Sequence, residues 1–299
     1  APSGVVPTGE GTGFIVDGDG TVLTNFHVID GADKVNVTLI DGTVVDAKVI
    51  GSDASSDVAV LRAEIPADRI VVATLGDSDA VQPGQLAVAI GTPFGLDHTI
   101  TAGIVSAVGR EFGTTPGGRP ARNLIQTDAP INPGNSGGPL FNAAGEVIGV
   151  TTSIESPVRG SVGIGFAVPV NRARSVLAQV KAGKAADPAW LGVAVGPLTP
   201  AVAATLNVPS SVTAGLVLTQ AVAGGPAAKA GLRGATADDG SPLGDVIVAV
   251  DGNIVRRTTD LTSYLDRRAP GDVVTVTMYR DGKRSDVKVT LGAWPQSSS

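Results

Sequence analysis

The sequence contains no cysteine, which excludes disulfide bonds, thiolate zinc sites and a cysteine nucleophile. Aromatic residues make up only 3% of the chain. The net charge is −6 and no run of basic residues occurs, so nucleic acid is not expected as a partner. No apolar run approaches the roughly 18 residues that span a membrane, and no signal-peptide pattern is seen. We therefore look for chemistry that does not depend on thiols.

The composition favours a β-rich chain of two domains. A length of 299 residues is typical of about two domains, and 42% hydrophobic residues are enough for substantial cores. The 40 glycines and 20 prolines indicate many turns and short strands. Short β-branched segments follow one another from Phe14 to Val168 without helices between them. This pattern predicts an antiparallel barrel or sandwich.

The first convincing helix marks the end of this β-rich part. Asn171 is a suitable N-cap, apolar residues recur after it at helical spacing, and Gly183 is a stop signal. Five further strands and two short helices are expected after the helix. The predicted parts are a first domain over 1–182, a linker over 183–187, a second domain over 188–294 and a disordered tail over 295–299.

The most specific segment is 132–139, in which Ser136 stands among glycines and prolines. Glycine permits positive φ and a close approach of other backbone. Such a bend can expose the Ser136 hydroxyl while the amides of Gly134 and Ser136 point to one place. That place could hold the anion of a tetrahedral acyl-transfer intermediate. Taken alone, the same pattern is equally typical of a tight turn in a β-protein.

A serine nucleophile needs a base to take its proton and an acid to orient that base. In chain order the sequence offers His27 at the end of a β-run, Asp57 at the entrance of a strand, and Ser136. This order is that of chymotrypsin-type enzymes. Asp53 is the alternative acid, but it has the character of a turn residue. The second histidine, His98, is assigned to a loop.

Three other motifs fail on their own patterns. A nucleophile elbow like that of α/β-hydrolases occurs at 134–138, but no helical pattern follows it. The segment 9–13 hints at a phosphate loop, and again no helix follows. The acidic turn from Asp17 has Val22 and Val28 where a calcium loop needs glycine and glutamate. No metal and no cofactor are therefore expected.

Three motifs in one order resemble the HtrA/Deg family. They are Thr-Asn-Phe-His-Val-Ile at 24–29, Ser-Asp-Val-Ala-Val-Leu at 56–61 and Thr-Asp-Ala-Pro-Ile-Asn-Pro-Gly-Asn-Ser-Gly-Gly-Pro-Leu at 127–140. The resemblance extends from about Gly11 to Leu291. Family members are trypsin-like serine endopeptidases of protein quality control and the stress response, with one or more C-terminal PDZ domains. The resemblance implies a mainly β fold, a chymotrypsin-like double β-barrel followed by a small α+β PDZ domain.

The resemblance also implies roles for single residues. His27 would be the general base, Asp57 its orienter and Ser136 the nucleophile that forms an acyl-enzyme. The amides of Gly134 and Ser136 would form the oxyanion hole. An apolar substrate pocket without a buried acid would prefer small aliphatic side chains to Lys or Arg. The pocket residues implied are Ile131, Ile164 and Phe166.

In the second domain, residues 190–194 resemble the carboxylate-binding loop of PDZ domains. An extended peptide would pair with a sheet edge while loop amides hold its C-terminal carboxylate. The peptide-binding residues implied are Leu191, Gly192, Val193 and Ala194. The partners implied are unfolded proteins as substrates and peptides with hydrophobic C-termini.

The family also suggests a place and an assembly. It implies an extracytoplasmic location, in the bacterial periplasm or cell envelope. A homotrimer is a possible assembly, although little of the chain precedes Gly11 and no second PDZ domain is expected. The alternative function is a peptide-binding holdase, or chaperone, with a resting triad. An esterase or lipase would need an exposed apolar lid, for which the sequence has no candidate.

Overall fold

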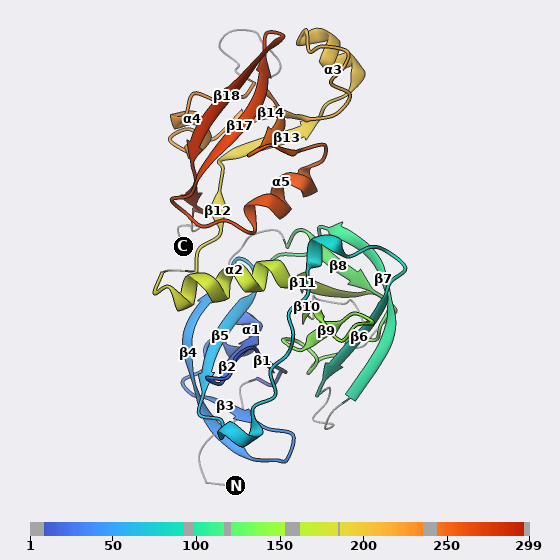
Figure 1. Ribbon diagram of the computed structural model, residues 1–299, viewed down its shortest axis with the longest axis vertical. Helices are drawn as coiled ribbons and strands as arrows, with labels where there is room; N and C mark the ends of the chain where they lie inside the picture. The colour runs from blue at the N-terminus through green and yellow to red at the C-terminus, as the bar shows by residue number, and fades with distance from the viewer. Residues whose placement is uncertain are drawn as a thin grey trace. The chain divides into compact units, whose positions relative to one another are not determined.

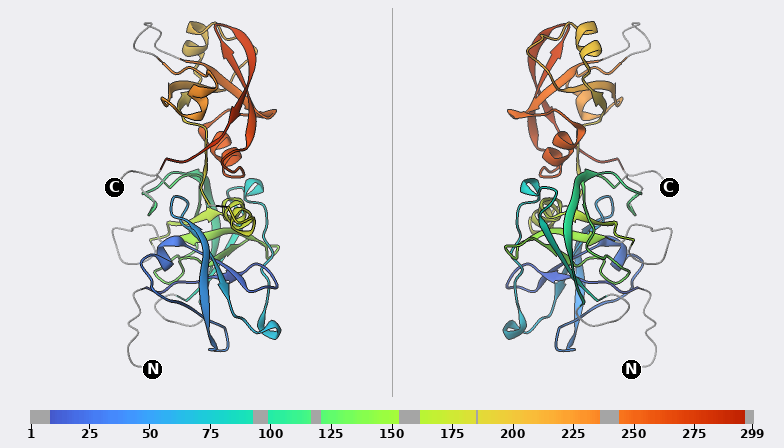
Figure 2. Two further views of the ribbon diagram at one scale, coloured as in Figure 1. Left: turned by 90° about the vertical axis from the view of Figure 1, so that its left-hand side faces the viewer. Right: turned by 90° about the vertical axis from the view of Figure 1, so that its right-hand side faces the viewer.

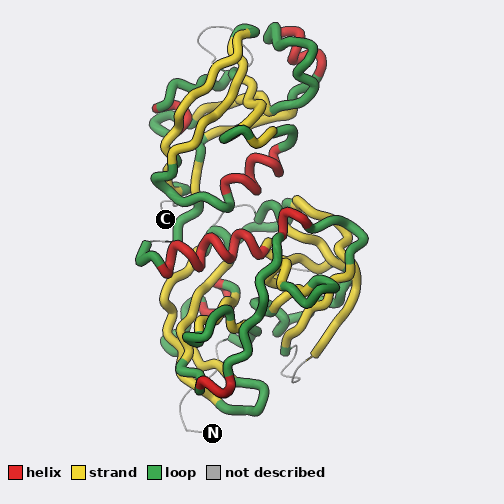
Figure 3. Tube along the Cα trace, in the orientation of Figure 1, coloured by secondary structure: helices red, strands yellow, loops and turns green. Residues whose placement is uncertain are grey.

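The computed structural model describes residues 9–92, 99–116, 121–152, 162–184, 186–235 and 244–295. The chain forms two compact units, which divide between Ala186 and Asp187 (Figure 1). Strands dominate both units, and most of the helices are short (Figure 3). The expected mainly β fold is therefore confirmed. The expectations for His98 and for the tail after Pro295 lie outside the described residues.

The first unit begins with a five-stranded antiparallel sheet in the order β1-β2-β5-β4-β3. Its members are β1 (Phe14–Ile15), β2 (Thr21–Thr24), β3 (Val35–Thr38), β4 (Val44–Asp53) and β5 (Val58–Ala63), with the short helix α1 (Phe26–Ile29) after β2. Successive side chains of a strand point to opposite faces. Val58 and Val60 of β5 join one hydrophobic cluster, and Ala59 and Leu61 join another. The strand that follows Asp57 is thus buried on both faces.

The second half of this unit is a closed barrel in the order β10-β11-β8-β7-β6-β9. Its strands are β6 (Leu86–Gly91), β7 (Thr99–Arg110), β8 (Leu124–Thr127), β9 (Pro139–Phe141), β10 (Val147–Thr152) and β11 (Gly165–Pro169). Two 3-10 turns, η1 (Ala67–Arg69) and η2 (Ser78–Ala80), lie on the chain between the two halves. Small and branched side chains such as Ala89, Ile125 and Leu140 fill the barrel. The segment with Ser136 connects β8 to β9.

Helix α2 (Val170–Lys181) follows the barrel and contacts strands of both halves (Figures 1 and 2). It begins earlier than predicted, because Pro169 occupies the N-cap position and Asn171 lies inside the first turn. The Asn171 side chain donates instead to Asp77 Oδ1 at 2.7 Å. The predicted stop is confirmed: Gly183 has φ +66°, and Lys184 N donates to Gln179 O, as in a Schellman motif.

The second unit is built on the sheet β13-β14-β15-β17-β18, with β16 beside β15 and a separate β12-β19 pair. Its strands are β12 (Ala189–Trp190), β13 (Val193–Pro197), β14 (Leu216–Ala221), β15 (Val246–Val250), β16 (Asn253–Ile254), β17 (Val273–Arg280), β18 (Lys283–Thr290) and β19 (Gly292–Ala293). Its helices are α3 (Pro200–Thr205), α4 (Pro226–Lys229) and α5 (Thr258–Leu265). Sequence reasoning predicted two helices and missed α3, which starts at the N-cap Thr199 followed by Pro200.

Candidate active site

The turn between β4 and β5 places two buried acids close together with different partners. Asp53 accepts hydrogen bonds from the amide and hydroxyl of Ser55, at 2.9 and 2.6 Å, and from the Ser56 hydroxyl. Its carboxylate also forms a buried ion pair with Arg172 of α2. Asp53, the alternative acid, therefore holds the turn. Asp57 leaves the same turn with φ +56°, a left-handed conformation that Asp tolerates better than most residues.

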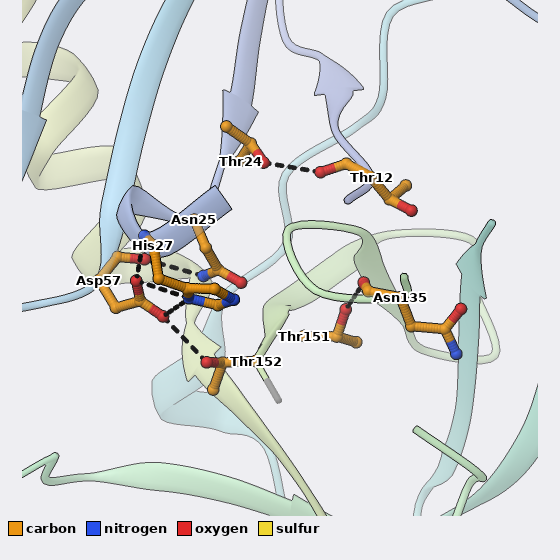
Figure 4. A network of polar contacts seen from close by, with 8 residues as sticks. All are labelled: Thr12, Thr24, Asn25, His27, Asp57, Asn135, Thr151 and Thr152. Carbon is orange, nitrogen blue, oxygen red and sulfur yellow. Dashed lines mark hydrogen bonds and ion pairs between the residues drawn. The ribbon is translucent and has the colours of Figure 1, made fainter. Parts of the chain in front are cut away.

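Asp57 orients the ring of His27 (Figure 4). His27 Nδ1 lies 2.8 Å from Asp57 Oδ2, and the His27 amide donates to Oδ1 at 3.0 Å. Thr152 of β10 donates to Oδ2 at 2.9 Å, and Asn25 Nδ2 donates to the Asp57 carbonyl at 2.8 Å. The Asp57 side chain is 6% exposed and the His27 side chain 34%. Because a carboxylate oxygen accepts hydrogen bonds, this contact is made by a His27 ring with a proton on Nδ1, and in the neutral tautomer with that proton Nε2 is an acceptor.

The loop before β9 brings Ser136 to the same region. Gly134 has φ +103° and Gly137 has φ +86°, so the bend uses backbone conformations that favour glycine. A Cβ on Gly137 would lie 2.2 Å from the Thr12 carbonyl oxygen, which leaves no room for a side chain. Thr151 fixes the loop to β10: its carbonyl accepts from Gly137 N, and its hydroxyl donates to Asn135 O at 2.5 Å.

Two neighbouring residues of β10 therefore hold the two halves of the site. Thr151 binds the loop with Ser136, and Thr152 binds the carboxylate of Asp57. Figure 4 shows both threonines, with the Asp57–His27 pair beside Thr152 and Asn135 beside Thr151. Sequence reasoning missed both residues. The only signal was two polar residues at the end of the apolar strand that starts at Val147.

The three residues expected in the substrate pocket lie in different surroundings. Ile131 is buried in the barrel cluster, against Gly165, where an added Cβ would meet its Cγ1 at 2.5 Å. Ile164 is 54% exposed. Phe166 is buried in another cluster and stacks on Phe112 with 4.7 Å between the ring centroids. Strand neighbours face opposite sides, so Phe166 points away from the face that Gly165 presents to Ile131.

The loop expected to bind a peptide carboxylate lies at the start of β13. Leu191 is buried in the core of the second unit, and Gly192 has φ +79°. Within the described residues β13 pairs with β14 alone, beginning with Val193 opposite Ala221, and its other edge has no strand partner. Helix α5 lies near this strand. The arrangement leaves one strand edge of the sheet available for pairing.

The described residues contain no cluster of His, Asp or Glu that could hold a metal ion. Among the same residues, no helix is both long enough and apolar enough to span a bilayer.

Comparisons with known proteins match both units. Residues 11–150 match the trypsin-like peptidase domain family and residues 162–291 match the PDZ domain family. The second match begins before α2, whereas the second unit of the structure begins at Asp187. The solved structure of the HtrA-type protease AlgW with tripeptide has a TM-score of 0.76 and 38% identity, covering 95% of this chain and 89% of that one. The chain belongs to the HtrA family.

Two curated relatives of this HtrA family member cover nearly its whole length. The probable periplasmic serine endoprotease DegP-like of Brucella suis biovar 1 is 41% identical over 289 residues, 97% of this chain and 53% of the relative. Protease Do-like 1, chloroplastic, of Arabidopsis thaliana is 42% identical over 297 residues, 98% of this chain and 66% of the relative. This chain spans about half to two thirds of their length. The family and the fold class predicted from the sequence are confirmed.

Proposed function

We propose that this chain is a serine endopeptidase that cleaves unfolded or misfolded proteins through His27, Asp57 and Ser136. The observation that carries the proposal is the contact of His27 Nδ1 with the buried Asp57 carboxylate, beside the glycine-rich loop of Ser136. A base with an oriented ring and a serine on a glycine-rich bend are two parts that acyl transfer needs.

Each residue has one task in the proposed mechanism. Asp57 keeps the proton on Nδ1 of His27, so that Nε2 takes the proton of the Ser136 hydroxyl. The Ser136 oxygen attacks the peptide carbonyl, and the amides of Gly134 and Ser136 bind the resulting oxyanion. His27 returns the proton to the departing amine, which leaves an acyl-enzyme. Water activated by the same histidine then releases the acid.

The substrate pocket is proposed to be apolar and narrow. The proposed lining residues are Ile131 and Ile164, which have aliphatic side chains, and Phe166, which lies on β11 and stacks on Phe112. A fitting methylene group contributes only about 1–3 kcal/mol in such a pocket, so we expect a graded preference for Val, Ala or Ile before the cleaved bond. Mapping the cleavage sites in casein tests this, and cuts mainly after Lys or Arg would contradict it.

The second unit is proposed to bind peptides with free hydrophobic C-termini. Amides of residues 191–194 would hold the carboxylate, and the unpaired edge of β13 would add the peptide as a strand. Solved structures of the relative AlgW carry a tripeptide or a decapeptide, which supports a peptide as the ligand.

Relatives named periplasmic support an extracytoplasmic place for this chain, in the bacterial periplasm or cell envelope. Protein quality control and a homotrimeric assembly are proposed from the family alone.

Labelling with a serine-reactive fluorophosphonate separates the protease from a holdase with a resting triad. We expect stoichiometric labelling of Ser136 in the wild type and none in Ser136→Ala. The same variant should lose a factor of about 10⁴ to 10⁶ in kcat on casein and keep its fold. His98→Ala is the control and should cleave normally. More than a tenth of wild-type turnover in Ser136→Ala would refute the proposal.

A further inference from the structure

The segment before β1 lies between helix α1, which carries His27, and the loop before β9, which carries Ser136 and is called the serine loop below. A Cβ on Gly11 would stand 2.7 Å from the Val28 side chain of α1 and 3.0 Å from the carbonyl oxygen of Ser136. Residues 9–13 resemble a phosphate loop in sequence, but no helical pattern follows them. The structure places this segment against both halves of the candidate active site.

Thr12 uses each of its polar groups to join separate parts of the site. Its amide donates to Ser136 O at 2.8 Å, and its carbonyl accepts from the Thr24 hydroxyl at 2.7 Å (Figure 4). The Thr12 hydroxyl donates to Gly134 O at 2.7 Å and accepts from Thr92 N at 3.1 Å. One residue thus connects the strand before His27, the end of β6 and the serine loop.

These contacts fix the backbone on which the oxyanion hole depends. The peptide group between Gly134 and Asn135 is held at both ends: its oxygen accepts from Thr12, and its N–H donates to Asn132 O at 3.0 Å. The Ser136 carbonyl is held by the Thr12 amide. The two proposed oxyanion donors, Gly134 N and Ser136 N, lie on either side of this fixed peptide.

We propose that Thr12 is a positioning residue for the oxyanion hole. Its hydroxyl holds the Gly134–Asn135 peptide so that the flanking amides stay aimed at the developing oxyanion. Catalysis by such amides depends on their orientation before the reaction begins. Thr12 acts through the loop and does not itself touch the reacting atoms. The inference rests on the proposed role of Ser136.

Two variants of Thr12 distinguish the contribution of its hydroxyl from that of its branched shape. Thr12→Val keeps the branched side chain and removes the hydroxyl, whereas Thr12→Ser keeps the hydroxyl. On an internally quenched peptide with valine before the cleaved bond, Thr12→Val should lower kcat about 10-fold to 100-fold and leave KM unchanged. Thr12→Ser should restore kcat to near the wild type. Thr277→Val, at a buried position of β17 in the second unit, is the matched control and should change neither constant.

Hydrogen exchange gives a readout that does not need activity. In the chain with both units, peptides covering 132–138 should exchange faster in Thr12→Val than in the wild type, and Thr12→Ser should not differ. Assays run well below the unfolding temperature of each variant. An unchanged kcat in Thr12→Val, or an equal loss in Thr12→Ser, overturns the proposal. If Ser136→Ala still cleaves, the proposed function and the oxyanion role of Thr12 fail together, whereas an inactive Ser136→Ala with unchanged kcat in Thr12→Val overturns the role of Thr12 alone.

Discussion

In each unit of the molecule, an aspartate in a left-handed conformation accepts a hydrogen bond from an aromatic ring side chain through its carboxylate. Asp57 has φ +56° and binds His27 of α1, and Asp251 has φ +46° and binds Tyr264 of α5. In both, the other carboxylate oxygen accepts a backbone amide, from His27 at 3.0 Å and from Thr275 at 2.6 Å. The same local device thus serves two different rings.

The difference lies in what the ring can do with its proton. Tyr264 is buried, which raises its pKa, and the hydrogen bond to Asp251 raises it further, so the phenol stays protonated near neutral pH. Arg268 donates to the same hydroxyl and lies over the ring, 4.6 Å from its centroid. The Tyr264 side chain therefore has a structural role and keeps its proton. The His27 side chain is 34% exposed, and in the proposed mechanism its ring takes up and returns a proton.

The largest expected effect tests that contrast directly. Asp57→Asn should lower kcat on casein by about 10⁴ with little change in fold, because an amide can stabilise the wrong tautomer of His27. Asp251→Asn, the matched change in the second unit, should leave kcat as in the wild type. Steady-state kinetics on both variants checks this. Similar kcat values for the two variants would mean that the two aspartates do not differ as argued.

Motifs and strand patterns predicted much of this molecule. The β-rich architecture and the family are confirmed, and the roles of His27, Asp57 and Ser136 are predictions with a concrete geometry behind them. Helix α3 was missed because a six-residue helix has too few apolar positions to show a period. Asn171 was misassigned as a cap because its partner, Asp77, is 94 residues away in the chain.

The support of the site could not be predicted from the sequence. Thr12 meets Gly134 across 122 residues, and Thr152 meets Asp57 across 95. Each contact depends on the closure of a barrel or the path of a loop. The local sequence around a single polar residue does not indicate its distant partner. Likewise, nothing local to Arg172 indicates that its partner is Asp53.

The next effect concerns stability. Arg172→Met leaves the buried Asp53 carboxylate without its cation, so the first unit should lose about 3–5 kcal/mol of unfolding free energy. Arg62→Met, at a surface pair 3.6 Å from Asp19, is the control and should lose at most about 1 kcal/mol.

All four tryptophans and tyrosines, Trp190, Tyr264, Tyr279 and Trp294, lie in the second unit. The unfolding of the first unit is therefore the calorimetric transition that intrinsic fluorescence does not detect. Removing both charges, as Asp53→Asn with Arg172→Met, should cost less than Arg172→Met alone, because Asn keeps a side-chain oxygen that can accept from Ser55. A larger cost for the double variant would contradict the buried-charge explanation.

A smaller effect is expected at Asp251. The Tyr264 hydroxyl and the Thr275 amide lower the pKa of Asp251, so its folded form holds the proton less tightly than the unfolded chain, whose Asp pKa is about 3.9. Its contribution is therefore present above that pH and is lost as the pH falls through the folded value. Asp251→Asn should cost about 1 kcal/mol at pH 7 and less at pH 3. Urea unfolding followed by tryptophan fluorescence measures the loss of unfolding free energy at each pH. A loss that does not depend on pH would contradict the lowered pKa of Asp251.

The smallest expected effect concerns whether the second unit binds the C-terminal carboxylate of a peptide. Ser136→Ala in the chain with both units should prevent cleavage, and a peptide with a hydrophobic free C-terminus should bind this variant with a Kd on the order of micromolar. The C-terminal amide of the same peptide should bind several-fold more weakly, because it loses charge-assisted hydrogen bonds to residues 191–194. Calorimetry on both forms measures the ratio, with a third peptide that keeps the free terminus but ends in aspartate as the control for side-chain preference. Equal affinity for acid and amide would mean that the loop before β13 does not bind a carboxylate. The free edge of β13 would then support pairing with internal segments of unfolded chains, and the second unit would differ from the first in holding substrate without selecting its end.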